Sequence, residues 1–129
     1  MDVMERQKLT EDQIEKLAVE IREFLLEHGL WQDVDIYFNH KRFGCKGPDG
    51  NYYYNDREHL FVEEDIEPQT YFEYVNPDHI LSMSFEGPVC EMLYYCERPE
   101  TRKKFDAIFE RYGLYYEFGN HWNFSCYYI

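Results

Sequence analysis

The fold is decided by residues 10–38, whose sequence is TEDQIEKLAVEIREFLLEHGLWQDVDIYF. Its first part has mainly apolar side chains at helical spacing, at Ile14, Leu17, Ala18, Ile21, Leu25 and His28. Thr10 and Gln13 have the spacing of a capping box, and Gly29 suits the position after a last helical turn. These features predict a helix over 10–28.

The pattern changes from helical to alternating after this helix. Val34 and Ile36 alternate with polar neighbours, as in a strand that is buried on one face. We expect residues 41–46 to be its hairpin partner. The turn sequence Gly-Pro-Asp-Gly at 47–50 is then expected to lead into a returning strand over 51–55.

The remainder of the chain predicts more strands, two helices and a final hairpin. In the middle we expect strands around 60–62, over 70–75 and over 79–85, with a turn at 76–78. Later we expect helices over 88–96 and 99–112, and a hairpin of strands 114–118 and 122–128 joined at Gly119-Asn120.

Taken together, these elements predict a single domain over residues 1–129. A helix at 10–28 precedes a β-rich middle over 31–85, two further helices and a C-terminal hairpin over 114–128. We predict an α+β fold, with an antiparallel sheet of about five strands and two to three helices packed on one face. The other face of the sheet would be open, and exposed tyrosines and carboxylates could line it.

One arrangement occurs twice along the chain. Residues 26–31, LEHGLW, and residues 110–115, ERYGLY, both pass from a helix end through Gly and Leu to an aromatic residue. We interpret the two segments as the same helix-glycine-strand chemistry used twice.

The charge of the protein is acidic and unevenly distributed. The chain has 26 acidic and 13 basic residues, a net charge of −13. Residues 58–97 contain ten carboxylates and no Lys or Arg, so this stretch supplies −10 and the rest of the chain only −3. Seven aromatic residues are interleaved with these acids: Phe61, Tyr71, Phe72, Tyr74, Phe85, Tyr94 and Tyr95. Such a charge argues against direct binding to nucleic acid or anionic lipid and favours a basic partner.

The sequence also indicates a location in the cell. Its polar start, MDVMERQKLTEDQ, lacks the apolar run of a secretory signal, and no stretch approaches the roughly 18 apolar residues of a membrane span. We therefore expect a cytoplasmic protein whose four cysteines are reduced and mostly buried. They are Cys45, Cys90, Cys96 and Cys126.

Signals for catalysis and for cofactors are weak. The five histidines and four cysteines lack zinc-site spacing, and the acidic run 63–67 lacks the pattern of a calcium-binding EF-hand, although it could hold a hydrated calcium or magnesium ion. Cys45 could form a dyad with His40 or His59, but there is no nucleophile elbow or phosphate-binding loop. We predict no catalytic residues, metal or cofactor.

The acidic, aromatic stretch leads to a hypothesis of electrostatic mimicry. Duplex DNA carries one negative charge per about 1.7 Å, and spaced carboxylates on a protein can present a comparable field to a groove lined with Lys and Arg. Aromatic rings would supply the desolvated anchor. The expected contact surface is centred on 63–73. The candidate partner-binding residues are Glu58, Glu63, Glu64, Asp65, Glu67, Tyr71, Glu73, Tyr74 and Asp78.

In size, acidity and aromatic content the chain resembles the small anti-CRISPR and antirestriction proteins that phages and mobile elements carry. The resemblance implies a protein inhibitor that occupies the DNA-binding channel of a nuclease, such as a CRISPR effector or restriction enzyme.

Other classes of function stay open at this point. An immunity protein that neutralises a basic toxin nuclease would have the same electrostatics. A small enzyme or ligand-binding domain could have an aromatic pocket around 52–54 or Tyr115-Tyr116. The charge could also serve solubility alone. The apolar end at 126–129 is compatible with a homodimer through an aromatic sheet edge or with a buried last strand.

Overall fold

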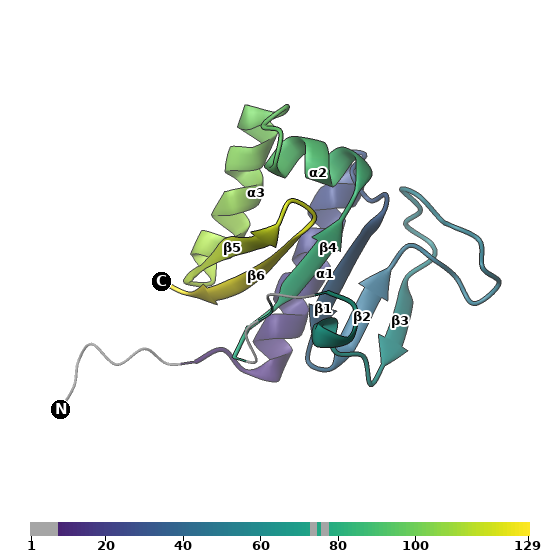
Figure 1. Ribbon diagram of the computed structural model, residues 1–129, viewed down its shortest axis with the longest axis horizontal. Helices are drawn as coiled ribbons and strands as arrows, with labels where there is room; N and C mark the ends of the chain where they lie inside the picture. Colours follow the sequence, from purple (N-terminus) through teal and green to yellow (C-terminus); the bar gives the residue numbers. More distant parts are fainter. Residues whose placement is uncertain (1–7, 73–74, 76–77) are drawn as a thin grey trace.

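The computed structural model describes residues 8–72, 75 and 78–129. Over these residues the chain forms three α-helices, one short 3-10 helix and a six-stranded antiparallel sheet, an α+β fold with one strand more than predicted (Figure 1). The elements in chain order are α1 (Glu11–Glu27), β1 (Val34–Phe38), β2 (Lys41–Gly44), β3 (Phe61–Glu64), η1 (Pro68–Thr70), β4 (Ser82–Phe85), α2 (Gly87–Leu93), α3 (Pro99–Arg111), β5 (Leu114–Asn120) and β6 (Asn123–Tyr128).

The order of strands in the sheet is β3-β2-β1-β4-β6-β5. Two hairpins, β1–β2 and β5–β6, form the two sides, and β4 lies between them and pairs with β1 and β6. The edges of the sheet are therefore β3 and β5. The C-terminal strand β6 is internal, and its Cys126 is fully buried, whereas Ile129 just after the strand is 65% exposed.

Helix α1 follows the predicted pattern closely. The Thr10 hydroxyl accepts a hydrogen bond from the Gln13 N–H (3.2 Å), and the Gln13 side chain accepts one from the Thr10 N–H (2.8 Å), which completes the capping box. Leu17, Ile21 and Leu25 on one side of the helix are fully buried. The periodic apolar face is thus the face that packs on the sheet.

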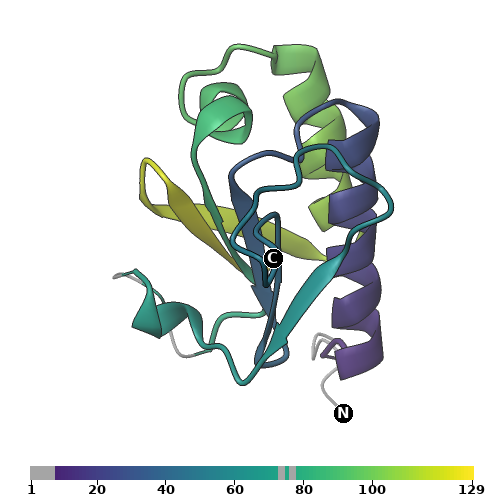
Figure 2. The same ribbon diagram turned by 90° about the vertical axis from the view of Figure 1, so that its right-hand side faces the viewer.

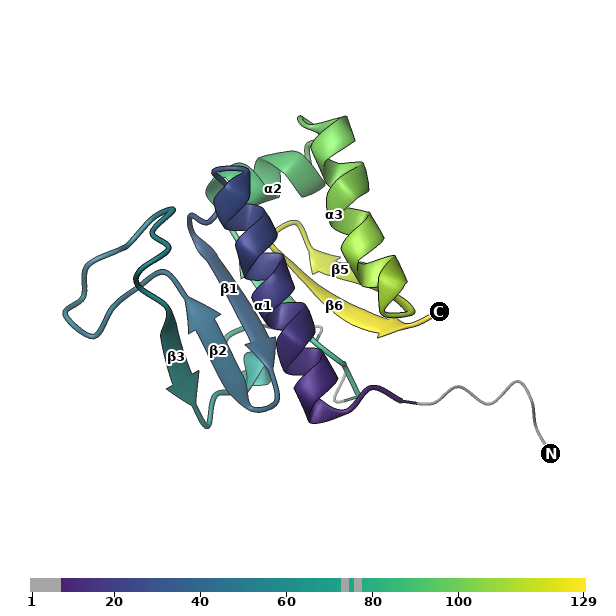
Figure 3. The same ribbon diagram turned by 180° about the vertical axis from the view of Figure 1, so that it is seen from behind.

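The two long helices cover one face of the sheet and leave the other open. Figures 2 and 3 show α1 and α3 on the same side, with α2 beside α3 at one end of the sheet. Strand register places Ile36 opposite Met83, and Met83 opposite Phe124, so these residues form one row of the core under the helices. Burying a side chain of this size stabilises the fold by roughly 1.5–3 kcal/mol.

The alternate residues of the same strands face the open side and are mostly polar. Asp35 lies opposite Ser84, and Tyr37 opposite Ser82. Tyr37 is only 2% exposed, because Tyr71 and Phe72 pack against its ring (centroids 6.1 and 5.5 Å). The strand is therefore less open on its polar side than alternation alone predicts.

Two predicted strands are wrong over the described residues. Segment 51–55 contributes only an isolated bridge between Tyr52 and Lys46, because Asn55 is held by Trp31 instead: its backbone N–H donates to the Trp31 carbonyl (2.8 Å) and its side chain accepts from the Trp31 N–H (2.9 Å). The segment predicted as a strand over 70–75 begins with the end of η1, a 3-10 turn that starts at Pro68.

Some predicted element ends also differ. Helix α2 ends at Leu93, three residues before the predicted end, and Cys96 has a positive φ of 57°, which a helix does not allow. The last hairpin turns at residues 121–122 and not at Gly119-Asn120. Asn120 still pairs with Asn123, and its side chain accepts from the Trp122 N–H (2.9 Å).

The repeated helix-glycine-strand arrangement is present in the structure. Gly29 after α1 and Gly113 after α3 both have positive φ, 68° and 75°, and each is followed by a two-stranded hairpin. Among the described residues, no helix is long and apolar enough to cross a membrane.

Candidate binding site on the open sheet face

The acids predicted to meet a partner lie mainly along one edge of the sheet. Glu63 and Glu64 are in edge strand β3, Asp65 follows in a left-handed conformation (φ 56°), and Glu67 precedes η1. Glu58 is exposed in an earlier turn, where its N–H donates to Asp56 (2.8 Å). Asp78 is also exposed. Glu73 and Tyr74 lie outside the described residues.

The fold brings Arg42 of β2 and His40 of the turn before it to this acidic edge. Arg42 pairs with Glu63 (2.6 Å), and the His40 ring bonds to the Glu67 carboxylate, which raises the pKa of His40. Both pairs connect residues more than twenty positions apart. The surface around 63–67 is therefore less negative than residues 58–97 alone suggest.

Tyr71 is the predicted aromatic contact whose position is clearest. Its ring is 47% exposed, and the Arg42 guanidinium lies over it at 4.7 Å from the centroid. The same guanidinium is 5.9 Å from the Tyr37 ring. Arg42 thus shows how this surface holds a guanidinium, between a carboxylate and aromatic faces.

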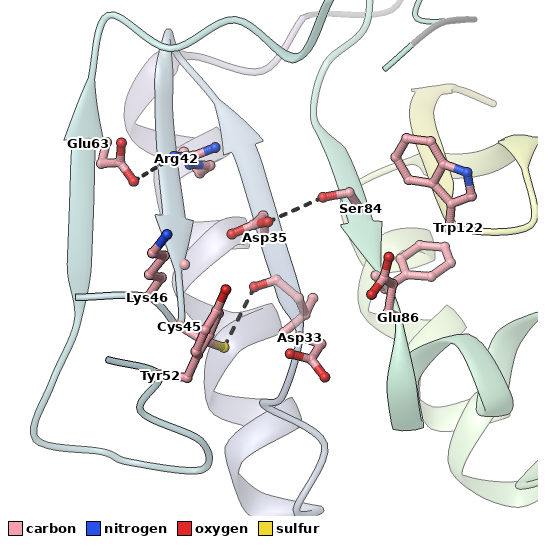
Figure 4. A pocket seen from close by; sticks show the side chains of 13 residues that line it. Asp33, Asp35, Arg42, Cys45, Lys46, Tyr52, Glu63, Ser84, Glu86 and Trp122 are labelled. Carbon is pink, nitrogen blue, oxygen red and sulfur yellow. Dashed lines mark hydrogen bonds and ion pairs between the residues drawn. The ribbon is translucent and has the colours of Figure 1, made fainter. Parts of the chain in front are cut away.

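Beside this ion pair the open face contains a hollow of about 420 Å³. We call it the acidic hollow. Its charged and polar lining consists of Asp33, Asp35, Glu63, Glu86, Arg42, Lys46, Tyr52, Ser84 and Trp122. Figure 4 shows Asp35 in the middle, Arg42 and Glu63 on one side, and Glu86 and Trp122 on the other. Of the predicted contact residues, only Glu63 is part of this lining.

Local geometry makes room for the carboxylates. Gly44 in β2 has no side chain, and a Cβ at this position would lie 2.7 Å from the Asp35 Oδ1. Asp33 precedes β1 in a left-handed conformation (φ 55°), and the Tyr54 hydroxyl donates to its Oδ1 (2.6 Å). This hydrogen bond raises the pKa of Tyr54 to about 12, so the phenol stays a donor.

The Asp35 carboxylate is weakly compensated. Burial raises its pKa to about 6; Arg42 and a hydrogen bond from Ser84 act against this shift, while Glu63 and Asp33 add to it. The Ser84 hydrogen bond is long, 3.4 Å, and Arg42 makes its direct ion pair with Glu63. Asp35 is therefore a carboxylate that a further positive group would stabilise.

The charge of the lining indicates what the acidic hollow can bind. It has four carboxylates against two cations, and Arg42 is already held by Glu63. The Lys46 ammonium lies 5.9 Å from the Tyr52 ring. With Asp35 ionised the lining carries −2, so its chemistry suits a guanidinium or ammonium group, which carboxylates and aromatic rings bind well.

The structure does not form the Cys-His dyad considered from the sequence. The Cys45 thiol donates to the Val34 carbonyl (3.7 Å), and burial raises its pKa to about 11. His40 bonds to Glu67 and His59 to Asp56. The cysteines are free thiols, and all except Cys96 are buried.

The structure also has one serine-histidine contact, but its serine is not accessible to a substrate. The Ser82 hydroxyl lies 3.0 Å from His79 Nδ1 and 2.7 Å from the Ser125 hydroxyl, but Ser82 is fully buried. Within the described part of the chain, no group of three or more His, Cys, Asp or Glu side chains is arranged to hold a metal ion.

Comparison with known proteins does not identify a relative. The chain matches no model of a protein family, no curated protein and no solved structure. Inferences about its function therefore rest on the geometry and charge of the acidic hollow.

Sequence reasoning missed three of the carboxylates that line the hollow. Asp33 and Asp35 are visible in the alternating pattern of 33–37, which predicts that they share the open face. What the sequence does not reveal is that β4 pairs with β1, which brings Glu86 to Asp33: the Glu86 N–H donates to the Asp33 carbonyl (2.9 Å).

Proposed function

We propose that the protein is an inhibitor that binds a basic protein surface, the nucleic-acid groove of a nuclease, through the acidic hollow and the adjoining β3 edge. The observation that carries the proposal is the acidic hollow itself, with four carboxylates, two cations and a weakly compensated Asp35. The expected contact surface therefore moves from 63–73 toward the open sheet face and keeps Glu63 and Tyr71.

The physical basis is complementarity of charge and shape. A net charge of −13 would steer the protein toward a basic groove. There an Arg or Lys side chain of the partner enters the hollow, where Asp33, Asp35 and Glu86 accept its hydrogen bonds as phosphate oxygens would. The rings of Tyr52 and Trp122 exclude water from the contact.

The proposal is tested by displacement of DNA. Fluorescent duplex DNA is bound to each of a panel of nucleases with basic DNA grooves, and its anisotropy is followed as the protein is added. We expect displacement from at least one of them. The hollow variant Asp33→Asn, Asp35→Asn, Glu86→Gln should bind at least tenfold more weakly, about 1.4 kcal/mol.

The matched control removes the same charge elsewhere. The variant Glu27→Gln, Glu91→Gln, Glu110→Gln changes three exposed carboxylates outside the hollow and should stay within about twofold of the parent protein. If both triple variants weaken binding equally, net charge alone explains it and the hollow is not the contact. If no nuclease loses its DNA, the inhibitor class is wrong.

A small-ligand-binding domain is a second candidate, because the hollow has a defined volume and Tyr52 on its wall. Its ligand would be a small guanidinium or ammonium compound. Titration calorimetry with arginine, agmatine and spermidine tests it: saturable heat that the hollow variant abolishes supports this candidate, and its absence removes it. An immunity protein would share the proposed surface and differ only in its target.

A further inference from the structure

The two edges of the sheet are unlike each other. Edge strand β3 has four residues, two of them Glu63 and Glu64, with Asp65 next in the chain. Edge strand β5 has seven residues, and its only charge is Glu117. Charged residues on an edge strand discourage pairing with another chain. The β3 edge thus has this protection by charge, and the β5 edge has little of it.

The backbone of β5 has free hydrogen-bonding groups on its outer side. The Ile129 N–H donates to the Gly113 carbonyl (3.0 Å), so in this ladder residues 113, 115 and 117 point toward β6. The N–H and C=O groups of Leu114, Tyr116 and Phe118 consequently point outward. Among the residues that the structure describes, no strand pairs on this side.

We propose that a second copy of the chain pairs antiparallel along β5, about a two-fold axis at Tyr116. The two sheets would then form one continuous sheet, in which the outward groups of 114–118 on each copy pair with those of the other. This pairing uses all of the regular part of β5, because the register shifts between Phe118 and Asn120.

The side chains fit this register. Pairing about Tyr116 places Tyr115 opposite Glu117 of the second copy on the open face, and Leu114 opposite Phe118 on the helix face. The Tyr115 hydroxyl already donates to the Glu117 carboxylate of its own chain (3.3 Å). An axis at Glu117 would instead place two carboxylates directly opposite each other, which is unfavourable.

Charge elsewhere in the molecule favours the β5 edge over the β3 edge for contact between two acidic copies. In the order β3-β2-β1-β4-β6-β5, the acidic edge is as far as the sheet allows from β5. Helix α3, which packs on β5, carries four basic side chains (Arg102, Lys103, Lys104 and Arg111) against three acidic ones (Glu100, Asp106 and Glu110). Pairing through β5 therefore keeps the acidic edges apart.

Cysteine cross-linking tests the register. In a Cys96→Ser background the single variants Tyr115→Cys and Glu117→Cys are mixed and oxidised. Residues opposite each other without mutual hydrogen bonds have Cα atoms about 4.5 Å apart, within the range of a disulfide. We expect several-fold more linked dimer from this mixture than from either variant alone.

The controls separate dimerisation from chance collision. A mixture of Glu117→Cys with Tyr127→Cys, which places the second thiol one strand inward on β6, should give no more linked dimer than the single variants. Sedimentation equilibrium of the unmodified protein should give the mass of two copies at high concentration. A monomer at every soluble concentration would overturn the proposal, and so would equal cross-linking in the two mixtures. Efficient linking of Tyr115→Cys alone would overturn the axis at Tyr116.

Discussion

The Asp35 carboxylate faces the open side of the sheet with one long hydrogen bond from Ser84, and burial raises its pKa to about 6. The usual value of 3.8 applies in the unfolded chain. Between these two pH values the folded protein holds a proton that the unfolded chain has lost, so the free energy of unfolding falls as pH rises from about 4 to about 6. Above pH 6 an ionised Asp35 opposes folding.

Replacing this carboxylate should therefore stabilise the protein. We expect Asp35→Asn to raise the free energy of unfolding at pH 7.5 by about 1–3 kcal/mol, and the gain should shrink toward pH 4, where Asp35 is protonated in the folded state. Urea unfolding at both pH values measures it. Glu91→Gln, which changes an exposed carboxylate, serves as the control. A gain that does not depend on pH would show that ionisation of Asp35 is not its cause.

At the scale of elements, the helices were predicted well because their signals are local. The capping box and the apolar face of α1 depend on residues within four positions of each other, and Pro99 and Gly113 bracket α3 in the same way. The prediction of a strand over 51–55 was wrong because a long-range contact determines the conformation of this segment. Asn55 forms hydrogen bonds with Trp31, and no local pattern reveals them. Helix α2 ends at Leu93, and the positive φ of Cys96, which rules out a helix to 96, is not marked by a pattern in the sequence.

The capping box gives a prediction for α1. Thr10→Ala removes the hydroxyl that accepts from the Gln13 N–H and should lower the free energy of unfolding by about 1 kcal/mol. Thermal or urea unfolding monitored by circular dichroism measures the loss. Thr101→Ala is the matched control, because α3 has no side-chain cap at its start and Thr101 should be dispensable. Equal losses in the two variants would contradict a capping role.

Strand β6 gives a second prediction at this scale. Phe124 is fully buried against Phe85, Phe109 and Tyr116, with centroid distances of 5.5, 5.8 and 4.4 Å. Phe124→Ala should cost about 3–5 kcal/mol, because it removes buried surface and leaves a cavity. Tyr95→Ala, at a ring that is 62% exposed, should cost far less. Urea unfolding measures the free energy of unfolding of both variants. A small loss for Phe124→Ala would contradict a central place for Phe124 in the core.

For the whole molecule, the sequence predicted the fold class and an open polar face, but only part of the candidate site. Glu63 and Tyr71 were predicted as contacts, and the structure brings both to Arg42. Asp35 and Glu86 were not predicted as contacts. They line the same hollow only because β1 pairs with β4, and these strands are about fifty residues apart in the sequence. Strand order is a property of the complete sheet and not of any segment.

Salt should weaken the proposed contact with a nuclease but not the proposed contact between two copies. Binding of a basic nuclease loses charge contacts as salt rises from about 50 to 200 mM, so its affinity should fall substantially. Pairing of two copies, each with a charge of −13, should be unaffected or strengthened, because salt screens their repulsion. Anisotropy and sedimentation at both salt concentrations measure these effects. Self-association that weakens with salt would contradict pairing through the least acidic edge.

The position of β4 between the two hairpins also has a consequence for the route by which the protein folds. Helix α1 with β1–β2 and helix α3 with β5–β6 are two local units, and each hairpin can close across two residues. Such hairpins form within about 1–10 μs, whereas joining distant strands is slower because a long loop must close first. In the described sheet, β4 is the only strand that connects the two units, and it has only four residues. Native-state hydrogen exchange should therefore show the β4 amides opening only with global unfolding, while those of edge strand β3 open more readily.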